Sequence, residues 1–263
     1  MKPTKYSFIF IKLYKSNKKE VLTIDRFIEE NSLYSVNRIK NTDIVQFDAH
    51  MLALPVWGAI SSIMRVPLNL ISFDYHTDTH APFAGAVCSR SMGNVNNISL
   101  RHPVIKSILE NKRYRREDFD FDDVVDIAAN NLRNDEHICT AVMLDYLKSY
   151  TIICNEDTNE AIKFQDDDRY NGYDATYYSK YDIDFIQLSV QSPIVLDFDL
   201  DYFNSRRDFS EAFIEMVSPL IKRAEVITVA REPKFFEMCK TDCAFELDEA
   251  LSMLSNITKT SHT

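Results

Sequence analysis

The chain has 263 residues, of which 40 are acidic and 30 are basic, so its net charge is −10 at neutral pH. This balance argues against a general affinity for nucleic acid or for an anionic membrane, and we expect neither as a partner. Only four glycines are present, whereas average usage of about 7% would give roughly 18. No two of them have the spacing of a dinucleotide-binding or Walker A loop, so the function is expected to lie in side chains.

The first residues of the chain alternate between apolar and polar from Tyr6 to Tyr14 and include Lys12. This stretch is too short to cross a membrane and lacks a cleavage site of small residues, so it predicts a strand, Ser7–Leu13, in a cytoplasmic protein. The five cysteines are odd in number, irregularly spaced and without a Cys-x-x-Cys pair. They predict reduced thiols, in keeping with that compartment.

Further along the chain, short apolar runs rich in β-branched residues alternate with segments of helical periodicity. The alternation predicts an α/β fold with a largely parallel central sheet flanked by helices, in one domain over residues 1–263. The predicted strands are Ile44–Phe47, Leu68–Phe73, Tyr150–Cys154, Phe185–Ser189, Ile194–Phe198 and Val226–Ala230. The predicted helices are Met51–Arg65, Pro103–Asn111, Asp122–Leu132, Asp135–Lys148, Phe209–Arg223 and Glu246–Ser255.

Polar segments interrupt this pattern at three places. Residues 113–123 and 155–184 are predicted to be surface segments, either solvated loops or insertions that contact a substrate, because long excursions in compact domains are often functional. Residues 258–263 predict a frayed tail. Pro103 fits the first turn of its predicted helix, where its missing N–H costs nothing.

Acidic and histidine residues follow three of the predicted strands. The motifs are Asp48-Ala49-His50, Asp74-Tyr75-His76-Thr77-Asp78 and Asp197-Phe198-Asp199-Leu200-Asp201. Ligands of α/β sheets bind beyond the carboxyl ends of the strands, and alternate residues of an extended segment share a face. We therefore expect the acidic side chains of each motif to point the same way, into a common site.

Crowded carboxylates raise each other's pKa unless a cation neutralises them. A lone Asp-rich turn is commonly a solvated loop or a helix cap, but these motifs directly follow apolar strands, where unpaired charge is costly. Mixed carboxylate and imidazole ligation suits manganese, iron or zinc rather than calcium. The number of such residues fits two ions about 3.5–4 Å apart.

At these motifs the chain resembles the arginase (ureohydrolase) superfamily, and most closely the divergent branch that contains the peptide arginases. Segment Ser72–Asp78 is similar to the Asp-Ala-His-x-Asp motif of that family, with Tyr75 in the Ala position. Segment Leu196–Phe203 is similar to the Leu-Asp-x-Asp-Leu-Asp-Phe-Phe of the branch. The resemblance implies a three-layer arginase-like fold, two Mn²⁺ ions (other divalent metals are compatible) and hydrolysis of arginine side chains in a ribosomal precursor peptide to ornithine and urea.

The resemblance also implies which residues hold the metals. One ion would be held by His50, Asp74, Asp78 and an Asp of the third motif. The other would be held by Asp74, His76 and two Asp of that motif. A homo-oligomer is compatible with the resemblance, because arginases commonly form trimers or hexamers.

The register of the third motif stays open at this point. One alignment selects Asp197 and Asp199 as ligands, and the other selects Asp199 and Asp201. We favour Asp199 as the bridging ligand and Asp201 as a terminal one, with Asp197 behind them.

Four residues are predicted to take catalytic roles in this scheme. Asp78 would take the proton of the nucleophilic water and deliver it to the departing amine. His80 and His137 are the candidates for a proton shuttle. Glu232, which follows the strand Val226–Ala230, offers a weak match to the Glu that grips the guanidinium in arginases.

The chain departs from true arginases in ways that favour a larger substrate than free arginine. Phe47-Asp48-Ala49-His50 stands where they have Gly-Gly-Asp-His, and the Asp-Pro that closes their last motif is missing. Their loops for free amino acids are not recognisable either. The alternatives are another ureohydrolase or a deacetylase-type C–N hydrolase acting on a small molecule, and a non-enzymatic metal-dependent module that binds a basic peptide.

Overall fold

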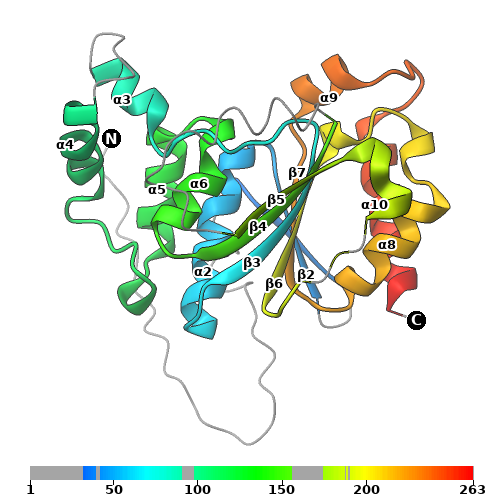
Figure 1. Cartoon of the computed structure of the whole chain (residues 1–263), viewed down its shortest axis with the longest axis horizontal. Coiled ribbons are helices and arrows are strands. Elements are labelled where there is room, and N and C mark those ends of the chain that lie inside the picture. The colour runs from blue at the N-terminus through cyan, green and yellow to red at the C-terminus, as the bar shows by residue number, and fades with distance from the viewer. Residues whose placement is uncertain are drawn as a thin grey trace, which may run out of the picture.

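The computed structural model describes residues 32–39, 42–90, 98–155, 174–186, 188 and 190–262. Its centre is a seven-stranded sheet in the order β1-β2-β7-β6-β3-β4-β5 (Figure 1). β1 runs antiparallel to β2, and all other neighbouring strands are parallel. The strands are β1 (Ser35–Ile39), β2 (Thr42–Phe47), β3 (Leu68–Asp74), β4 (Leu147–Cys154), β5 (Asp174–Ser179), β6 (Ile194–Asp199) and β7 (Ala224–Ala230).

Helices cover both faces of the sheet and make the three layers that the resemblance implies (Figure 1). Helices α2 to α6 lie on one face, and α8, α9 and α10 lie on the other. Their bounds are α2 (Ala53–Met64), α3 (Ala84–Arg90), α4 (Ile98–Leu109), α5 (Phe121–Asn131), α6 (His137–Met143), α8 (Glu211–Ile221), α9 (Pro233–Cys239) and α10 (Leu247–Ser261).

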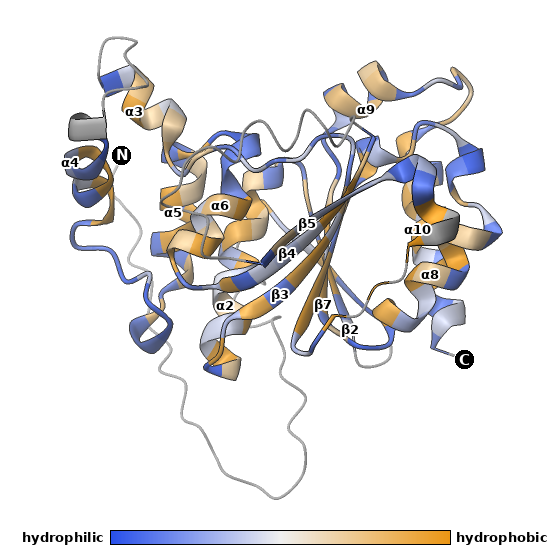
Figure 2. Ribbon diagram, in the orientation of Figure 1, coloured by the Kyte–Doolittle hydropathy of each residue, from blue (hydrophilic) through white to orange (hydrophobic). Residues whose placement is uncertain are grey.

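Each central strand is buried on both faces, so its residues alternate between two apolar cores. In β3, Leu70 packs with the α2 to α6 layer, whereas Ile71 and Phe73 pack with the α8 to α10 layer. In β6, Val195 and Leu196 divide in the same way. Figure 2 shows the corresponding hydrophobic strands between the two helical layers. This double burial explains the continuous apolar runs of the sequence.

Strand–helix alternation is confirmed as the organising pattern, with several local corrections. The predicted strand Phe185–Ser189 is wrong in its described residues, because residues Lys180–Phe185 form a 3-10 helix, η6. β1 and β5 were not predicted, and β5 lies within the segment 155–184 expected to be a surface excursion. The predicted strand Ser7–Leu13 lies outside the described residues.

The helices also differ from the prediction at several places. The predicted helix Asp135–Lys148 is wrong at its end, because α6 ends at Met143 and β4 already begins at Leu147, and α3 and α9 were not predicted. Pro103 lies inside α4 rather than in its first turn, since that helix already begins at Ile98. Helix α10 continues to Ser261, so the predicted frayed tail at 258–263 is wrong in its described part. Thr258 and Ser261 are buried there, and Thr258 Oγ1 donates to the carbonyl of Leu254.

Residues 113–123 pack at the amino ends of the strands. The Tyr146 hydroxyl, just before β4, donates to the carbonyl of Tyr114, and Phe119 makes an edge-to-face contact with the Tyr146 ring. Gly58 of α2 lets these rings approach, because a Cβ there would lie 2.5 Å from the Phe119 ring. The segment therefore sits at the edge of the sheet opposite to the strand ends that carry the acidic motifs.

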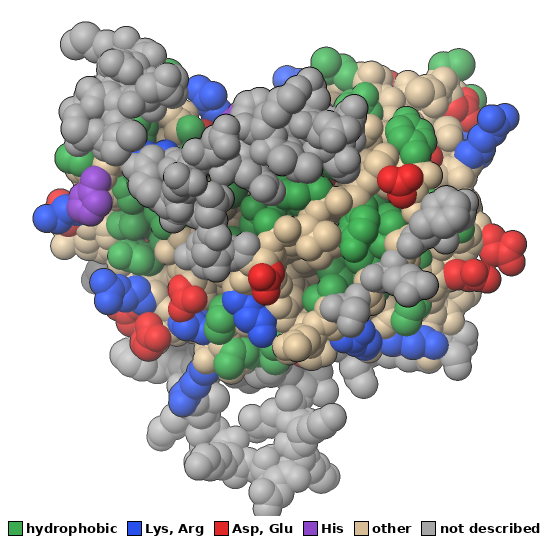
Figure 3. Space-filling model, in the orientation of Figure 1, with side chains coloured by type: hydrophobic (Ala, Val, Ile, Leu, Met, Phe, Trp, Pro, Cys, Tyr) green, Lys and Arg blue, Asp and Glu red, His purple; other side chains and the backbone are tan. Residues whose placement is uncertain are grey.

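Charged side chains on the described surface are mixed in sign (Figure 3). The basic residues of segment 112–116 are likewise accompanied by acidic ones. Its Lys112, Arg113 and Arg116 pair with Asp126, Asp120 and Asp145, respectively. Within the described residues, no helix is both long enough and apolar enough to cross a membrane.

Candidate metal centre

Four adjacent parallel strands, β2, β7, β6 and β3, bring the three motifs and Glu232 to one edge of the sheet. The strand register aligns the motifs, since Asp197 on β6 lies opposite Ser72 on β3 and opposite Thr228 on β7. The chain also runs outward from β3 to β4 and β5 and then returns to β6 on the other side of β3. Such a reversal of strand order opens the crevice in which α/β proteins bind their ligands.

Side chains at this edge form four groups in which one oxygen or nitrogen atom per residue lies within 4.8 Å of the others. We name two of them. The inner group is His50, Asp74 and Asp199; the outer group is Asp74, His76 and Asp201. The other two are His50–Asp78–His137 and Asp199–Asp201–Glu232. Asp74 belongs to both named groups, and Asp199 joins the inner group to the one that contains Glu232.

His50 is fully buried and is oriented by a carboxylate behind it. Its Nε2 lies 2.8 Å from Asp197 Oδ2, which also accepts a hydrogen bond from the Ser72 hydroxyl. The other Asp197 oxygen accepts from Thr228, whose hydroxyl in turn accepts from the Trp57 indole at 3.2 Å. A carboxylate in this position fixes the tautomer of a ligating histidine and leaves the opposite nitrogen free for a metal.

The opposite nitrogen of His50, Nδ1, faces three carboxylates. It lies 2.9 Å from Asp78, 3.2 Å from Asp199 and 3.5 Å from Asp74. Asp197, in contrast, belongs to none of the four groups. The structure therefore places Asp197 behind His50, and brings Asp199 and Asp201 together with the other candidate ligands.

Buried polar atoms without partners show where a cation would fit. Within the described residues, Asp74 Oδ2 and His137 Nε2 are buried and make no hydrogen bond. Leaving such atoms unsatisfied is costly, and a bound ion would satisfy them. Imidazole and carboxylate donors also fit a divalent transition metal, although they do not identify which one.

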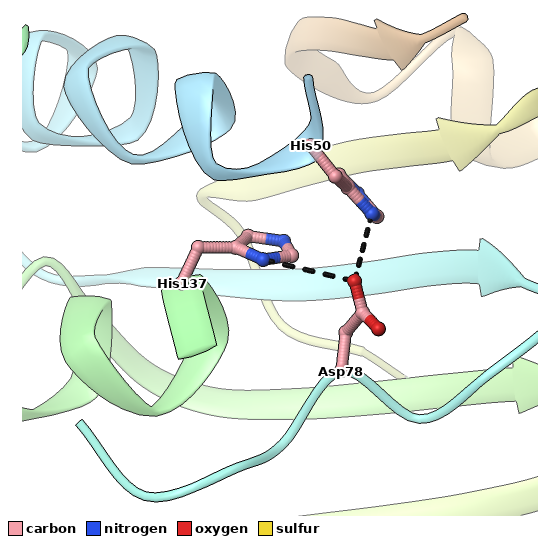
Figure 4. A group of neighbouring side chains, drawn as sticks. All are labelled: His50, Asp78 and His137. Atoms are coloured by element: carbon pink, nitrogen blue, oxygen red, sulfur yellow. Dashed lines mark ion pairs between the residues drawn. The ribbon is translucent and has the colours of Figure 1, made fainter. Parts of the chain in front are cut away.

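His137 joins the site through Asp78 (Figure 4). Its Nδ1 lies 2.6 Å from the carbonyl of Asn134, which can only accept, so Nδ1 carries the hydrogen. The same nitrogen lies 3.8 Å from Asp78, and the His137 ring packs 4.1 Å from that of His50. Nε2 of His137 therefore carries a lone pair.

Glu232 is buried in the site although it is a loop residue. Its Oε1 accepts hydrogen bonds from the backbone N–H of His50 at 3.0 Å and from the side chain of Asn134. Glu232 and Asp78 both adopt a positive φ, 36° and 47°. Four described residues outside the four groups also have a positive φ, namely Arg65, Phe83, Asn111 and Asp145, so this backbone conformation is not confined to the site.

Burial dominates the titration of the shared carboxylates. It raises the pKa of Asp74 and of Asp199 well above the usual range, and the neighbouring charges of Asp78 and Asp201 add to these two shifts. In the group that contains Glu232, burial raises the pKa of Asp201 to about 6 and that of Glu232 to about 7. Proton uptake by the metal-free cluster is the expected response of crowded, buried carboxylates.

The pKa values of the two buried histidines and of Asp78 depend on neighbouring charges as well as on burial. Burial lowers the pKa of His50, but the charge of Asp197 and its hydrogen bond more than offset this and hold the pKa well above its usual value. Burial and the nearby charge of His50 lower the pKa of His137 to about 4, so its ring is neutral at pH 7. Burial would raise the pKa of Asp78, yet the hydrogen bond and charge of His50 keep that pKa below the usual value.

One predicted site residue lies away from the cluster. His80 is half-exposed, belongs to none of the four groups, and has its Nε2 3.9 Å from Asp135. His76 is 42% exposed and reaches the cluster through Nδ1, 3.8 Å from Asp201. The His76 ring is therefore the part of the outer group that meets solvent, because Asp74 and Asp201 are each only 1% exposed.

Sequence reasoning missed Thr228 and Asn134. Thr228 is the one hydroxyl residue in the apolar strand β7, and a buried hydroxyl amid apolar neighbours signals a polar partner. Asn134 offered no comparable signal, because it acts through contacts to residues far along the chain, Glu232 among them.

The chain matches no protein-family model and no curated protein.

Proposed function

We propose that this protein is a dinuclear metal hydrolase that converts arginine side chains of a ribosomal precursor peptide to ornithine and releases urea. The observation that carries the proposal is the meeting of the inner and outer groups at one shared carboxylate, Asp74. Two cation positions that share a carboxylate are the arrangement used by two-metal hydrolases. The motif resemblance to the peptide arginases supports the choice of reaction.

The residues of the site would take the following roles in the reaction. Two divalent ions, held by the inner and outer groups, would supply a water of lowered pKa at the site. Asp78, kept ionised by His50, is placed to take a proton from that water as it adds to the guanidinium carbon. The same carboxyl group returns the proton to the ornithine nitrogen as the C–N bond breaks, leaving urea.

His137 is suited to orient rather than to carry protons. A neutral ring with its Nδ1 hydrogen committed to Asn134 can accept a hydrogen bond at Nε2 from water or from the departing amine. The exposure of His80 leaves it without a role in the chemistry at the cluster. Neither histidine is therefore assigned a proton shuttle.

Charge and exposure support a peptide-borne guanidinium as the substrate. Glu232 and Asp201 belong to one group and present carboxylate oxygens that can balance the substrate cation. The half-exposed His76 leaves the outer group accessible, so a side chain projecting from a larger molecule can reach it. The described residues of the 113–123 segment play no part, because they pack at the opposite edge of the sheet.

The test is release of urea by the Mn²⁺-loaded protein from four substrates: an arginine-containing peptide, free arginine, agmatine and an acetyl-lysine peptide. The proposal expects urea only from the peptide, with arginine replaced by ornithine in the mass spectrum. Urea from free arginine or agmatine would instead make it a small-molecule ureohydrolase, and acetate release a deacetylase. Metal-dependent peptide binding without turnover would make it a binding module.

A further inference from the structure

Asp201, in the outer group, lies in a closed circuit of contacts. Its Oδ1 accepts from the backbone N–H of Tyr75 at 3.2 Å, and the backbone N–H of Asn155 donates to the carbonyl of Tyr75. The Asn155 side chain donates to Asn204 Oδ1, and Asn204 Nδ2 donates to the carbonyl of Cys239 at 2.6 Å. The thiol of Cys239 closes the circuit 4.0 Å from Asp201 Oδ2.

Asn204 is the residue in this circuit whose side chain joins the most segments. Its amide links the loop after β6 to the end of β4, through Asn155, and to the end of α9, through Cys239. Its backbone carbonyl also accepts from the N–H of Thr241 at 2.8 Å. The circuit thus ties together the chain segments that surround the outer group.

The partners of Asn204 leave one orientation for its amide. The carbonyl of Cys239 can only accept, so Nδ2 must face it. Lys180 can only donate, and its Nζ lies 2.8 Å from Oδ1. An aspartate of the same shape would keep the contact with Lys180 but would lose the donor to Cys239.

Lys180 holds this arrangement with all three of its N–H groups. Besides Asn204 Oδ1, its Nζ donates to the carbonyl of Tyr202 at 2.6 Å and to Asp208 at 3.0 Å. The side chain is only 10% exposed, and Nζ lies 4.7 Å from the centre of the Tyr202 ring. A buried ammonium with every donor used is a rigid support.

We propose that Asn204, held by Lys180, is a positioning residue that sets how tightly the outer group binds its metal. It touches no candidate ligand directly. It acts through Cys239 and Asn155, which fix the loop and the backbone N–H on either side of Asp201. The inner group does not depend on it, because Asp197 orients His50 from the opposite side. The inference rests on the metal centre of the proposed function.

The test compares Asn204→Ala with wild type by titration of the metal-free protein with Mn²⁺ and with Co²⁺. In wild type we expect two ions. In Asn204→Ala the outer ion should bind about 10–100-fold more weakly, the usual cost of losing a residue that supports a ligand, while the inner affinity stays unchanged. The Co²⁺ absorption spectrum should lose the component of the outer ion only.

Three further variants complete the design. Asn204→Asp should show a smaller loss in outer affinity than Asn204→Ala, because it keeps the bond to Lys180. Asn155→Ala removes the hydrogen bond from Asn155 to Asn204 Oδ1, and it tests the same effect on outer affinity if the Asn204 variants fail to fold. Asn130→Ala is the matched control, since it removes one exposed side-chain hydrogen bond, to Asp126 on α5, and should change neither affinity.

Two outcomes would overturn the inference while leaving the proposed function intact. Equal weakening of both ions would mean that Asn204 supports the fold generally, and unchanged affinities in folded Asn204→Ala and Asn155→Ala would mean that it supports nothing at the site. Wild-type protein that binds no metal would overturn the proposed function together with the inference. Two ions without urea release would overturn the proposed reaction alone.

Discussion

The inner and outer groups use the same residue types, yet their surroundings differ sharply. His50 of the inner group is fully buried, and Asp197, Ser72 and Thr228 stand behind it in a chain of hydrogen bonds. His76 of the outer group is 42% exposed, and no described carboxylate stands behind its ring in that way. Under the proposed function, the contrast predicts a tightly held inner ion and a more readily exchanged outer ion.

The largest effect is expected from Asp74→Asn, which removes the carboxylate shared by both groups. Both ions should then bind more weakly by more than about 100-fold, the upper range for a residue that only supports a ligand. The metal-free fold should persist, because the raised pKa of Asp74 already makes a neutral side chain acceptable there. Metal content after dialysis measures the loss, with the exposed Asp248→Asn on α10 as the control. Retention of either ion at full affinity would argue against a shared ligand.

The next largest effect is expected from Asp197→Asn, which should weaken metal binding in the inner group only. Asp197→Asn keeps the shape of the side chain but removes the charge that fixes the His50 tautomer, so the inner affinity should fall about 10–100-fold. The outer affinity should stay the same. Ser72→Ala, which removes only one of the hydrogen bonds to Asp197, should cause a smaller loss in the same titration. A larger change at the outer ion would reverse the assignment of the two groups.

A narrower change is expected from His76→Ala. The outer ion should be lost and urea release should fall, because one ligand of the outer group disappears. The inner ion should remain, and the thermal unfolding midpoint of the metal-free protein should hardly move, since substitutions at exposed side chains typically change stability by about 0.5 kcal/mol or less. Calorimetry and metal analysis on one sample separate these readouts. A clear drop in the midpoint would assign His76 a structural role.

The smallest effect is a dependence on pH. Folding raises the pKa of Asp201 to about 6 and that of Glu232 to about 7, so between about pH 4 and 7 the folded metal-free protein binds more protons than the unfolded chain. Through these two groups its stability therefore falls as the pH rises across that window. A metal displaces the protons, so metal affinity should rise over the same window. Unfolding scans at pH 5 and 7, with and without metal, test both signs; a metal affinity independent of pH would contradict them.

The parts of the fold that sequence could predict are the ones buried on both faces. β3 and β6 are largely apolar runs, and the Asp residues at their ends were expected to face a site. The edge strands β1 and β5 escaped prediction because an edge strand buries less and tolerates polar residues. β5 reads Asp-Ala-Thr-Tyr-Tyr-Ser inside an Asp-rich segment, which hides any apolar alternation.

The site was predictable to the extent that it depends on strand ends. The motifs placed His50, Asp74 and Asp199 together, because parallel strands deliver their carboxyl ends to one edge. What stands behind these residues depends on register between distant strands. No local sequence pattern predicts that Thr228 pairs with Asp197 across the strands, or that the Asn134 side chain donates a hydrogen bond to Glu232. The sequence also does not predict that His80 is exposed, because His80 continues the same alternation of residues as Asp78.

The positive φ of Asp78 and Glu232 has an evolutionary consequence. Glycine would adopt this backbone without strain, whereas other L-residues pay roughly 1–2 kcal/mol there, and the chain keeps only four glycines elsewhere. Exchanging either residue for glycine would relieve this strain, but it would also remove a carboxylate of the cluster and, at position 232, the acceptor of the His50 N–H. Under the proposed function, relatives that keep the metal centre are therefore expected to keep an acid at both positions despite the strain.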